Sequence, residues 1–461
     1  MNRRRLQTVL RGRQASDPLL RQLTSVAVAS GSSLAVVGGY VRDAALGRKS
    51  RDLDLVCHAR AAAVTRLLRE TWKTRGFRFR KRGVTTWRFD SAGRQVDLVD
   101  ATRRGLERDL ARRELTINAI AFDLASGRVL DPLGGLADLR LLRLRAPRPG
   151  IMAEDPVRAL RLARFVAELP GARPSPGLLR EAASVARALR RASVERLRDE
   201  LNRLFQARDA APGLDLLERL ALTDSILPEL APARGCAAGA GRPDVWRHTL
   251  EAIALSTPGR RIPGAAVLRD PERRRVLRWA LLLHDVAKPD TLARAADGRP
   301  TFHGHETLGA ARSDRILRRL RVPRAERRRV VALVRNHLRP GHLADSGASP
   351  RGMRRLVRDA GDDLPLLVAH AACDARASGS PDATGRWRRL RAVLLALLEL
   401  PAEMRRRAPR PLLDGRDVMH VLGLEPGPEI GRILEALRDE QESGRVANRG
   451  QALSWLRRQG V

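Results

Sequence analysis

The sequence predicts an α+β fold, in which a mixed head of 147 residues precedes a purely helical remainder. Short apolar runs typical of strands occur in the head. After residue 155, leucine, alanine and arginine recur at helical spacing, and proline and glycine interrupt the pattern. The strand candidates are Leu34–Val37, Asp52–Val56, Thr85–Phe89 and Gln95–Val99.

A glycine turn follows the first strand candidate. The run Leu34–Val37 ends at Gly38 and Gly39, and a short helix is expected from Val41 to Leu46. A glycine turn before a helix leaves backbone N–H groups that can meet a phosphate chain. The turn is therefore a candidate phosphate-binding element.

Two aspartates follow in the second strand candidate. Because side chains alternate along a strand, Asp52 and Asp54 share one face, and Leu53 and Leu55 face the core. Two neighbouring carboxylates repel each other unless a cation lies between them. The glycine turn and the acids together favour Mg²⁺-dependent nucleotidyl transfer. A strand–turn–helix unit with surface aspartates is the alternative interpretation.

These residues also carry a family resemblance. GGYVRD from Gly38 and DLD from Asp52 resemble the signature of class II tRNA nucleotidyltransferases and bacterial poly(A) polymerases, of the polymerase-beta-like superfamily. Further motifs match in order nearly to the C-terminus. The resemblance implies a polymerase-beta-like nucleotidyltransferase head (1–147), an all-α neck and body with nucleobase-recognition and RNA-binding helices (148–240), an HD metal-dependent phosphohydrolase-like domain (241–380) and a helical, tRNA-binding tail (381–461).

The charge balance indicates a polyanionic partner. Lysine and arginine number 88 and the acids 52, which gives a net charge of +36, while 43% hydrophobic residues are typical of a globular chain. No apolar run approaches the length of a transmembrane helix, so nucleic acid is favoured over a membrane. The three cysteines are widely spaced, and the basic N-terminus lacks the apolar core of a signal peptide. We expect a cytoplasmic protein.

Two further features belong to the strand-rich part of the head. Lys81–Thr86 is a small basic turn that enters a strand. It resembles the flexible loop before the third head strand of the family, although an ordinary hairpin explains it equally well. Asp97 is a candidate third acid that deprotonates or orients the attacking 3′ hydroxyl. An exposed strand aspartate is the alternative.

A basic segment follows at Asp109–Ala119 and resembles the family motif RRDFTINA. In isolation it is a solvated start of a helix, whose core side would hold Ile117, Ile120 and Ala121. Glu114 stands where the family usually has aspartate. The resemblance implies that the triphosphate and ribose are contacted by Asp109, Arg112, Arg113 and Asn118.

The helical part begins with Glu154–Arg161. Asp155 is an expected N-cap and Pro156 an expected first helical residue, so a capped helix with salt bridges accounts for the pattern. The segment also resembles the EDxxR motif of the family. That resemblance implies that Asp155, Arg158 and Arg161 select the incoming base at its Watson–Crick edge. Glu195 and Arg196, in a motif that closes the neck, are expected support residues.

Histidines cluster in the middle of the chain. Imidazoles and carboxylates on successive helices suit a divalent-metal hydrolase, while structural histidines are the alternative. The order of the residues resembles the HD phosphohydrolase domain, which in some tRNA nucleotidyltransferases acts as a 2′,3′-cyclic phosphodiesterase or phosphatase. Its four-ligand core matches His248, His284, Asp285 and Asp374, and extra ligand positions match His305 and His337. The identity of this divalent metal is left open.

The tail resembles the C-terminal module of the same enzymes. Pro426, Gly427 and Pro428 precede a helix start, where free backbone N–H groups can meet RNA phosphates. A plain turn between helices is the alternative.

The sequence as a whole predicts a Mg²⁺-dependent enzyme that adds or repairs the 3′-terminal CCA of tRNA from CTP and ATP without a template. Asp52 and Asp54 would hold Mg²⁺, and Gly38, Gly39 and Arg42 would cradle phosphates. An A-adding enzyme, a CC-adding enzyme or a poly(A) polymerase are alternatives with the same chemistry. An HD metal phosphohydrolase with a nucleotide-binding head is the alternative of another class. The oligomeric state is not predicted.

Overall fold

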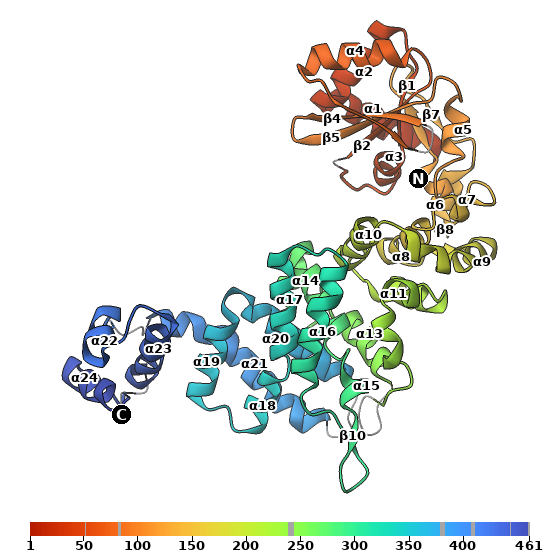
Figure 1. The fold of residues 1–461 in the computed structure, drawn as a ribbon. Coiled ribbons are helices and arrows are strands. Elements are labelled where there is room, and N and C mark those ends of the chain that lie inside the picture. Colours follow the sequence, from red (N-terminus) through yellow and green to blue (C-terminus); the bar gives the residue numbers. More distant parts are fainter. Residues whose placement is uncertain are drawn as a thin grey trace. The chain divides into compact units, whose positions relative to one another are not determined.

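The chain forms two compact units, Met1–Pro228 and Glu229–Val461, in a computed structural model (Figure 1). No helix among the described residues is long and apolar enough to cross a membrane. The structure describes residues 1–50, 52–81, 84–237, 244–378, 383–406, 411–442 and 444–459.

A seven-stranded sheet organises the first unit. The order is β3-β4-β5-β2-β1-β6-β7, in which β2 and β5 are parallel and the other neighbours antiparallel. A separate pair of short strands, β8 (Arg143–Leu144) and β9 (Arg173–Pro174), is parallel. The strands of the large sheet are β1 (Leu34–Val37), β2 (Leu53–Cys57), β3 (Phe77–Lys81), β4 (Val84–Ser91), β5 (Arg94–Asp100), β6 (Ala121–Asp123) and β7 (Val129–Leu130).

Helices surround this sheet and then continue alone. Around the sheet lie α1 (Arg3–Ser16), α2 (Pro18–Ser30), α3 (Gly39–Ala45), α4 (Ala61–Trp72), α5 (Leu106–Leu110), the 3₁₀ turn η1 (Thr116–Asn118) and α6 (Gly135–Arg140). The helical part comprises α7 (Ile151–Glu154), α8 (Arg158–Glu168), α9 (Pro176–Ser184), η2 (Ala186–Arg191), α10 (Val194–Gln206), α11 (Ala211–Arg219), α12 (Thr223–Ile226) and η3 (Pro228–Ala233).

Burial on both faces explains the continuous apolar run of β1. Leu34 and Val36 pack with α1, α2 and α4 on one face, and Ala35 and Val37 pack with α5 on the other. The predicted strand over these residues is confirmed at both ends. The other three predicted strands are also present, with ends shifted by one or two residues.

Two local predictions were wrong. Asp52 precedes β2, which begins at Leu53, and it is exposed. The predicted helix around Ile117 is a 3₁₀ turn followed by strand β6, because pairing with β1 extends the backbone there, although Ile117 itself is buried. Of the two alternatives for Lys81–Thr86, the strand register supports the hairpin, because Lys81 at the end of β3 pairs with Val84 at the start of β4; Arg82 and Gly83 lie outside the described residues.

The second unit is almost entirely helical. Its last three helices share a small core of their own and lie together in Figure 1. Its elements are α13 (Val245–Leu255), η4 (Ala265–Arg269), α14 (Pro271–Leu283), α15 (Lys288–Thr291), the hairpin β10 (Ala293–Arg294) and β11 (Pro300–Thr301), α16 (His305–Arg319), α17 (Arg324–Asn336), α18 (Arg339–Asp345), α19 (Pro350–Ala360), η5 (Gly361–Asp363), α20 (Leu364–Ala377), α21 (Ala383–Arg406), α22 (Gly415–Leu422), α23 (Pro428–Glu442) and α24 (Arg449–Arg457).

Candidate functional site

The sheet brings two of the predicted acids side by side. Asp54 on β2 is paired directly with Asp97 on β5, so both side chains lie on one face. The side chain of Asp54 is half exposed. Desolvation raises its pKa, Arg113 opposes the rise, and Asp97, Glu114 and Asp52 add to it. Such a concentration of negative charge is what a bound cation would relieve.

Gly38 lies against this acidic face. Its φ of 75° and ψ of −132° lie in a region that non-glycine residues rarely adopt, and it is the N-cap of α3. An added Cβ would come within 2.6 Å of Nη1 of Arg113 and 3.2 Å of Oδ2 of Asp54. Glycine is therefore required here by both conformation and space.

Two arginine side chains, Arg113 and Arg42, lie beside this acidic face and the glycine turn. Nη1 of Arg113 is 3.9 Å from Oδ2 of Asp54, and its Nη2 is 3.5 Å from Oδ2 of Asp109. Arg42 donates to Oδ1 of Asn118 at 2.9 Å and also pairs with Asp43. Arg113 therefore lies beside Asp54, and Arg42 on α3 holds Asn118 near the turn at Gly38. Gly39 is the first residue of α3.

Glu114 lies at the centre of an ion-pair chain that the sequence did not predict. It accepts a hydrogen bond from Nδ2 of Asn118 at 3.0 Å and lies 3.6 Å from Nη1 of Arg161. Arg161 in turn pairs with Glu200 at 2.9 Å, as does Arg164. Burial alone would raise the pKa of Glu114, but chiefly the Arg161 guanidinium lowers it to about 2. The chain ties η1 to α8 and α10.

Asp155 does not begin the helix as predicted. It is the C-cap of α7, and α8 starts only at Arg158, after a turn in which the Arg158 N–H donates to the Asp155 carbonyl. The Asp155 carboxylate accepts a 2.6 Å hydrogen bond from Arg196. Arg158 is buried and donates to the backbone carbonyls of Ile151 and Arg112 at 2.8 and 2.7 Å. Of the predicted base-selecting residues, Asp155 is therefore tied to α10 and Arg158 to the segment that carries Arg112.

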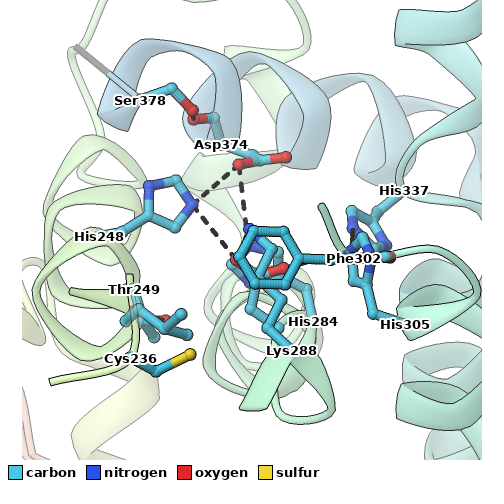
Figure 2. Close-up of polar contacts among 12 residues, drawn as sticks. Cys236, His248, Thr249, His284, Lys288, Phe302, His305, His337, Asp374 and Ser378 are labelled. Carbon is cyan, nitrogen blue, oxygen red and sulfur yellow. Dashed lines mark hydrogen bonds and ion pairs between the residues drawn. The ribbon is translucent and has the colours of Figure 1, made fainter. Parts of the chain in front are cut away.

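The second unit gathers all six predicted metal ligands in one place. His248 and His284 converge on Asp374, with Nε2–Oδ1 distances of 2.9 and 3.7 Å (Figure 2). Nε2 of His284 is 3.1 Å from Oδ2 of Asp285, and Nε2 of His305 is 3.4 Å from the other carboxylate oxygen. The side chains form two groups of three, and within each group the three ligand atoms lie within 4.8 Å of one another. One group is His248, His284 and Asp285, and the other is Asp285, His305 and His337, so Asp285 belongs to both.

The orientation of the rings suits metal binding. Nδ1 of His284, of His305 and of His337 each bonds the carbonyl three residues earlier, at 2.8, 2.6 and 2.6 Å. Nδ1 is therefore the N–H donor, which leaves Nε2 as the ring nitrogen that faces the cluster. Nε2 of His305 and of His337 face each other at 3.3 Å. Nε2 of His248 and of His284 make no aligned hydrogen bond, so a cation fits this donor set.

The pKa pattern reflects the same crowding. Burial alone would lower the pKa of His284, but Asp285 and Asp374 raise it to about 10. Burial and His284 lower the pKa of His337 to about 4. The pKa values of Asp285 and Asp374 are held well below their usual range by the neighbouring histidines, with Lys288 also acting on Asp285. Both carboxylates are therefore ionised at neutral pH.

Sequence reasoning missed three residues at these sites. Nζ of Lys288 lies 2.6 Å from Oδ2 of Asp285, and this three-residue spacing along the chain was visible. His370 is fully buried against His284 and His337, with ring centroids 5.3 and 5.7 Å away; it precedes Asp374 by one helical turn. Arg88 donates two hydrogen bonds to Asp97, at 2.7 and 2.8 Å, which only the strand register reveals.

A cavity of about 190 Å³ opens beside the cluster in the second unit. The helices α18, α20 and α21 contribute to its wall. Side chains from the cluster line one part of it, and the rest is lined by residues that include Lys288, His342, Arg386 and Trp387. The cluster is therefore accessible to a ligand.

Fold and sites define a nucleotidyltransferase head joined to a helical domain with a metal-type cluster. The family models match the Poly A polymerase head domain over residues 34–145, the probable RNA and SrmB-binding site of polymerase A over 177–234, and the HD domain over 245–375. Curated relatives extend the match. The A-adding tRNA nucleotidyltransferase of Deinococcus radiodurans is 38% identical over 92% of this chain and 95% of its own length.

Two other relatives carry different specificities. The CC-adding tRNA nucleotidyltransferase of Thermus thermophilus is 34% identical over 91% of this chain and 92% of its own, and the multifunctional CCA protein of Xanthomonas campestris is 32% identical over 87% and 96%. The chain belongs to the tRNA nucleotidyltransferase family. The fold agrees: the CCA-adding enzyme of Thermotoga maritima, solved with tRNA, superposes with a TM-score of 0.61 at 18% identity, over 95% of both chains.

Proposed function

We propose that this protein adds or repairs the 3′-terminal CCA of tRNA, using CTP and ATP and no template. One observation carries the proposal: relatives named as A-adding, CC-adding and multifunctional CCA enzymes align with 87% to 92% of the chain, from the head through the helical domain. That breadth argues against a phosphohydrolase whose head only binds nucleotide. The net charge of +36 suits a tRNA backbone.

In the proposed mechanism, Asp52 and Asp54 hold Mg²⁺. When bound there, the ion would neutralise triphosphate charge and make the 3′ hydroxyl more acidic. Desolvation first, and then the negative charge of Asp97, Glu114 and Asp52, raise the pKa of Asp54, and a cation held there would relieve that charge. Asp97 is held by Arg88, so we assign it to orienting the hydroxyl rather than to taking its proton while that pair is intact.

The triphosphate would lie over the glycine turn. Gly38 and Gly39 supply close backbone approach, and Arg42 and Arg113 supply positive charge beside it. Asn118, held between Arg42 and Glu114, would meet the ribose. Asp109 and Arg112 complete the proposed nucleotide site.

Base selection is assigned to α8 and its neighbours. Asp155, Arg158 and Arg161 are the proposed contacts to the Watson–Crick edge. Arg196, which donates to Asp155, would fix the orientation of that carboxylate. Since Arg161 already pairs with Glu114 and Glu200, these two carboxylates would fix the orientation of its guanidinium for that contact.

We propose a second, hydrolytic activity in the HD region. The donor set His248, His284, Asp285 and Asp374, with His305 and His337, suits divalent metal, and Asp285 belongs to both groups of ligand atoms. A metal bound there would supply Lewis acidity for phosphate-ester hydrolysis. A 2′,3′-cyclic phosphate RNA end is the proposed substrate. The four domains proposed for the chain are 1–147, 148–240, 241–380 and 381–461.

A-adding activity is the second candidate, favoured by the 38% identity to the Deinococcus radiodurans enzyme. Purified protein with tRNA ending at the discriminator base, at C or at CC, given CTP, ATP or both, distinguishes the products. Growth that stops at CCA on all three ends supports the proposal. Growth restricted to A on the CC end means an A-adding enzyme, growth by C alone a CC-adding enzyme, and an unlimited A ladder a poly(A) polymerase.

The proposed compartment is the cytoplasm. All three cysteines, Cys57, Cys236 and Cys373, are free thiols. The protein would encounter its proposed tRNA substrate in the cytoplasm.

A further inference from the structure

The edge strand of the head sheet presents two aromatic rings. β3 is the first strand in the sheet order, and its residues alternate between phenylalanine and arginine up to Arg80. Phe77 is 67% exposed, which is unusual for so large an apolar side chain. Its ring stacks on that of Phe79, with centroids 5.8 Å apart and planes 26° apart. The two rings together form the aromatic platform.

Strand register places this platform on the face that carries the catalytic acids. Phe77 pairs with Arg88, Arg88 with Asp97, and Asp97 with Asp54. Residues paired across strands point to the same face. Because neighbouring strands lie about 4.8 Å apart, the row from Asp54 to Phe77 spans about 14 Å. The platform is therefore within a few nucleotides of the site where nucleotide addition would occur.

The aromatic residues on the two faces of the sheet differ in how far other side chains cover them. On the opposite face, Trp87 is covered by the guanidinium groups of Arg69 and Arg78, at 4.4 and 5.7 Å from the ring centre. On the acidic face, Arg88 lies 5.5 Å from the ring of Phe79, while Phe77 is open to solvent. A stacked pair of rings with one ring open to solvent matches the bases of a single strand.

We propose that Phe77 and Phe79 stack bases of the single-stranded 3′ end of the RNA substrate, just upstream of the nucleotide being extended. The proposal rests on the proposed function of the head. Stacking tolerates every base, so the platform would hold the strand without reading its sequence. A protein partner is less suitable, since two phenyl rings offer far less than the roughly 1,200 Å² that a specific interface buries.

The first test compares Phe77→Ala with wild type in tRNA extension. Base stacking on an aromatic residue contributes about 1–3 kcal/mol, so KM for tRNA should rise at least about 5-fold, while KM for ATP stays within 2-fold. Phe77→Trp should restore the KM for tRNA. Val28→Ala is the matched control, because Val28 on α2 is also exposed, at 65%, and should leave both values unchanged.

The second test reads stacking directly. RNA with 2-aminopurine at one of the last four positions should lose fluorescence on binding to wild-type protein at one position, and Phe77→Ala should abolish that quenching. This signal does not require turnover, so it tests the platform even if wild-type protein extends no tRNA. Absence of extension by wild-type protein would refute the proposed function but not the platform. Unchanged KM and unchanged quenching in Phe77→Ala overturn the inference. Altered self-association with unchanged RNA binding would instead assign the platform to a protein contact and also overturn it.

Discussion

The ion pair between Glu114 and Arg161 gives a prediction with a calculable size. Glu114 is 14% exposed, and its pKa falls from an ordinary 4.5 to about 2. Since one pKa unit corresponds to 1.36 kcal/mol, its ionisation contributes about 3 kcal/mol to folding at pH 7. Glu114→Gln should therefore destabilise the first unit by about 2–3 kcal/mol, the lower value because Arg161 retains Glu200.

The pH dependence has a definite sign. A carboxyl with a depressed folded-state pKa stabilises the protein fully above its unfolded value of 4.5, and the contribution is lost as the pH falls towards about 2. The free-energy gap between wild type and Glu114→Gln should therefore narrow by about 1.4 kcal/mol from pH 7 to pH 3.5. Hydrogen exchange in urea, followed in peptides from residues 106–123, measures this gap for the first unit separately.

Two variants control this experiment. Glu114→Asp retains the charge at a longer distance from Arg161, so it should lose less stability and keep the pH dependence. Glu107→Gln removes an exposed carboxylate on α5 and should change stability by less than about 0.5 kcal/mol. A gap in Glu114→Gln that is equally large at both pH values would refute the electrostatic explanation, and so would the absence of any gap.

Three further predictions concern the sites. Gly38→Ala should slow nucleotide addition more than about 10-fold, because strain of about 1–3 kcal/mol and contact with Arg113 disturb the turn; unchanged kinetics would contradict this. His284→Ala should reduce the divalent metal retained after desalting, measured by mass spectrometry, whereas His58→Ala in the head should not; equal metal content in both would exclude the ligand role. Arg196→Ala, which releases Asp155, should change the ratio of CTP to ATP incorporation about 10-fold, and an unaltered ratio would remove Arg196 from base selection.

Strong local patterns predicted most of the fold. The run Leu34–Val37 was predictable because a strand buried on both faces must be apolar throughout. The predicted helix start at Asp155 was wrong, since α8 begins at Arg158 after a turn. The Asp155 carboxylate also accepts a hydrogen bond from Arg196, 41 residues later in the chain. No local propensity contains such a contact. The helix predicted from Ile117 to Ala121 was wrong for a similar reason, since β6 begins at Ala121 and pairs with the distant strand β1.

The site residues also fall into two groups, those predictable from the sequence and those that depend on the assembled fold. The histidine cluster was found from order along the chain, because the residue types that bind metal are few. His370 was missed, since a histidine that only packs against other histidines has no signature of its own. The pairing of Arg88 with Asp97 and the position of Phe77 depend on strand register, which follows from the assembled sheet.

The central claim is that the head transfers nucleotides through its paired carboxylates, and Asp54→Asn tests it most directly. Extension of tRNA with CTP and ATP would be measured at single-nucleotide resolution, beside tRNA binding, with Asp90→Asn as the matched control, because Asp90 on β4 is an exposed aspartate of the same sheet. We expect Asp54→Asn to bind tRNA within about 3-fold of wild type and to add no nucleotide, while Asp90→Asn extends normally. Nucleotide addition by Asp54→Asn at a rate near that of wild type would contradict the account.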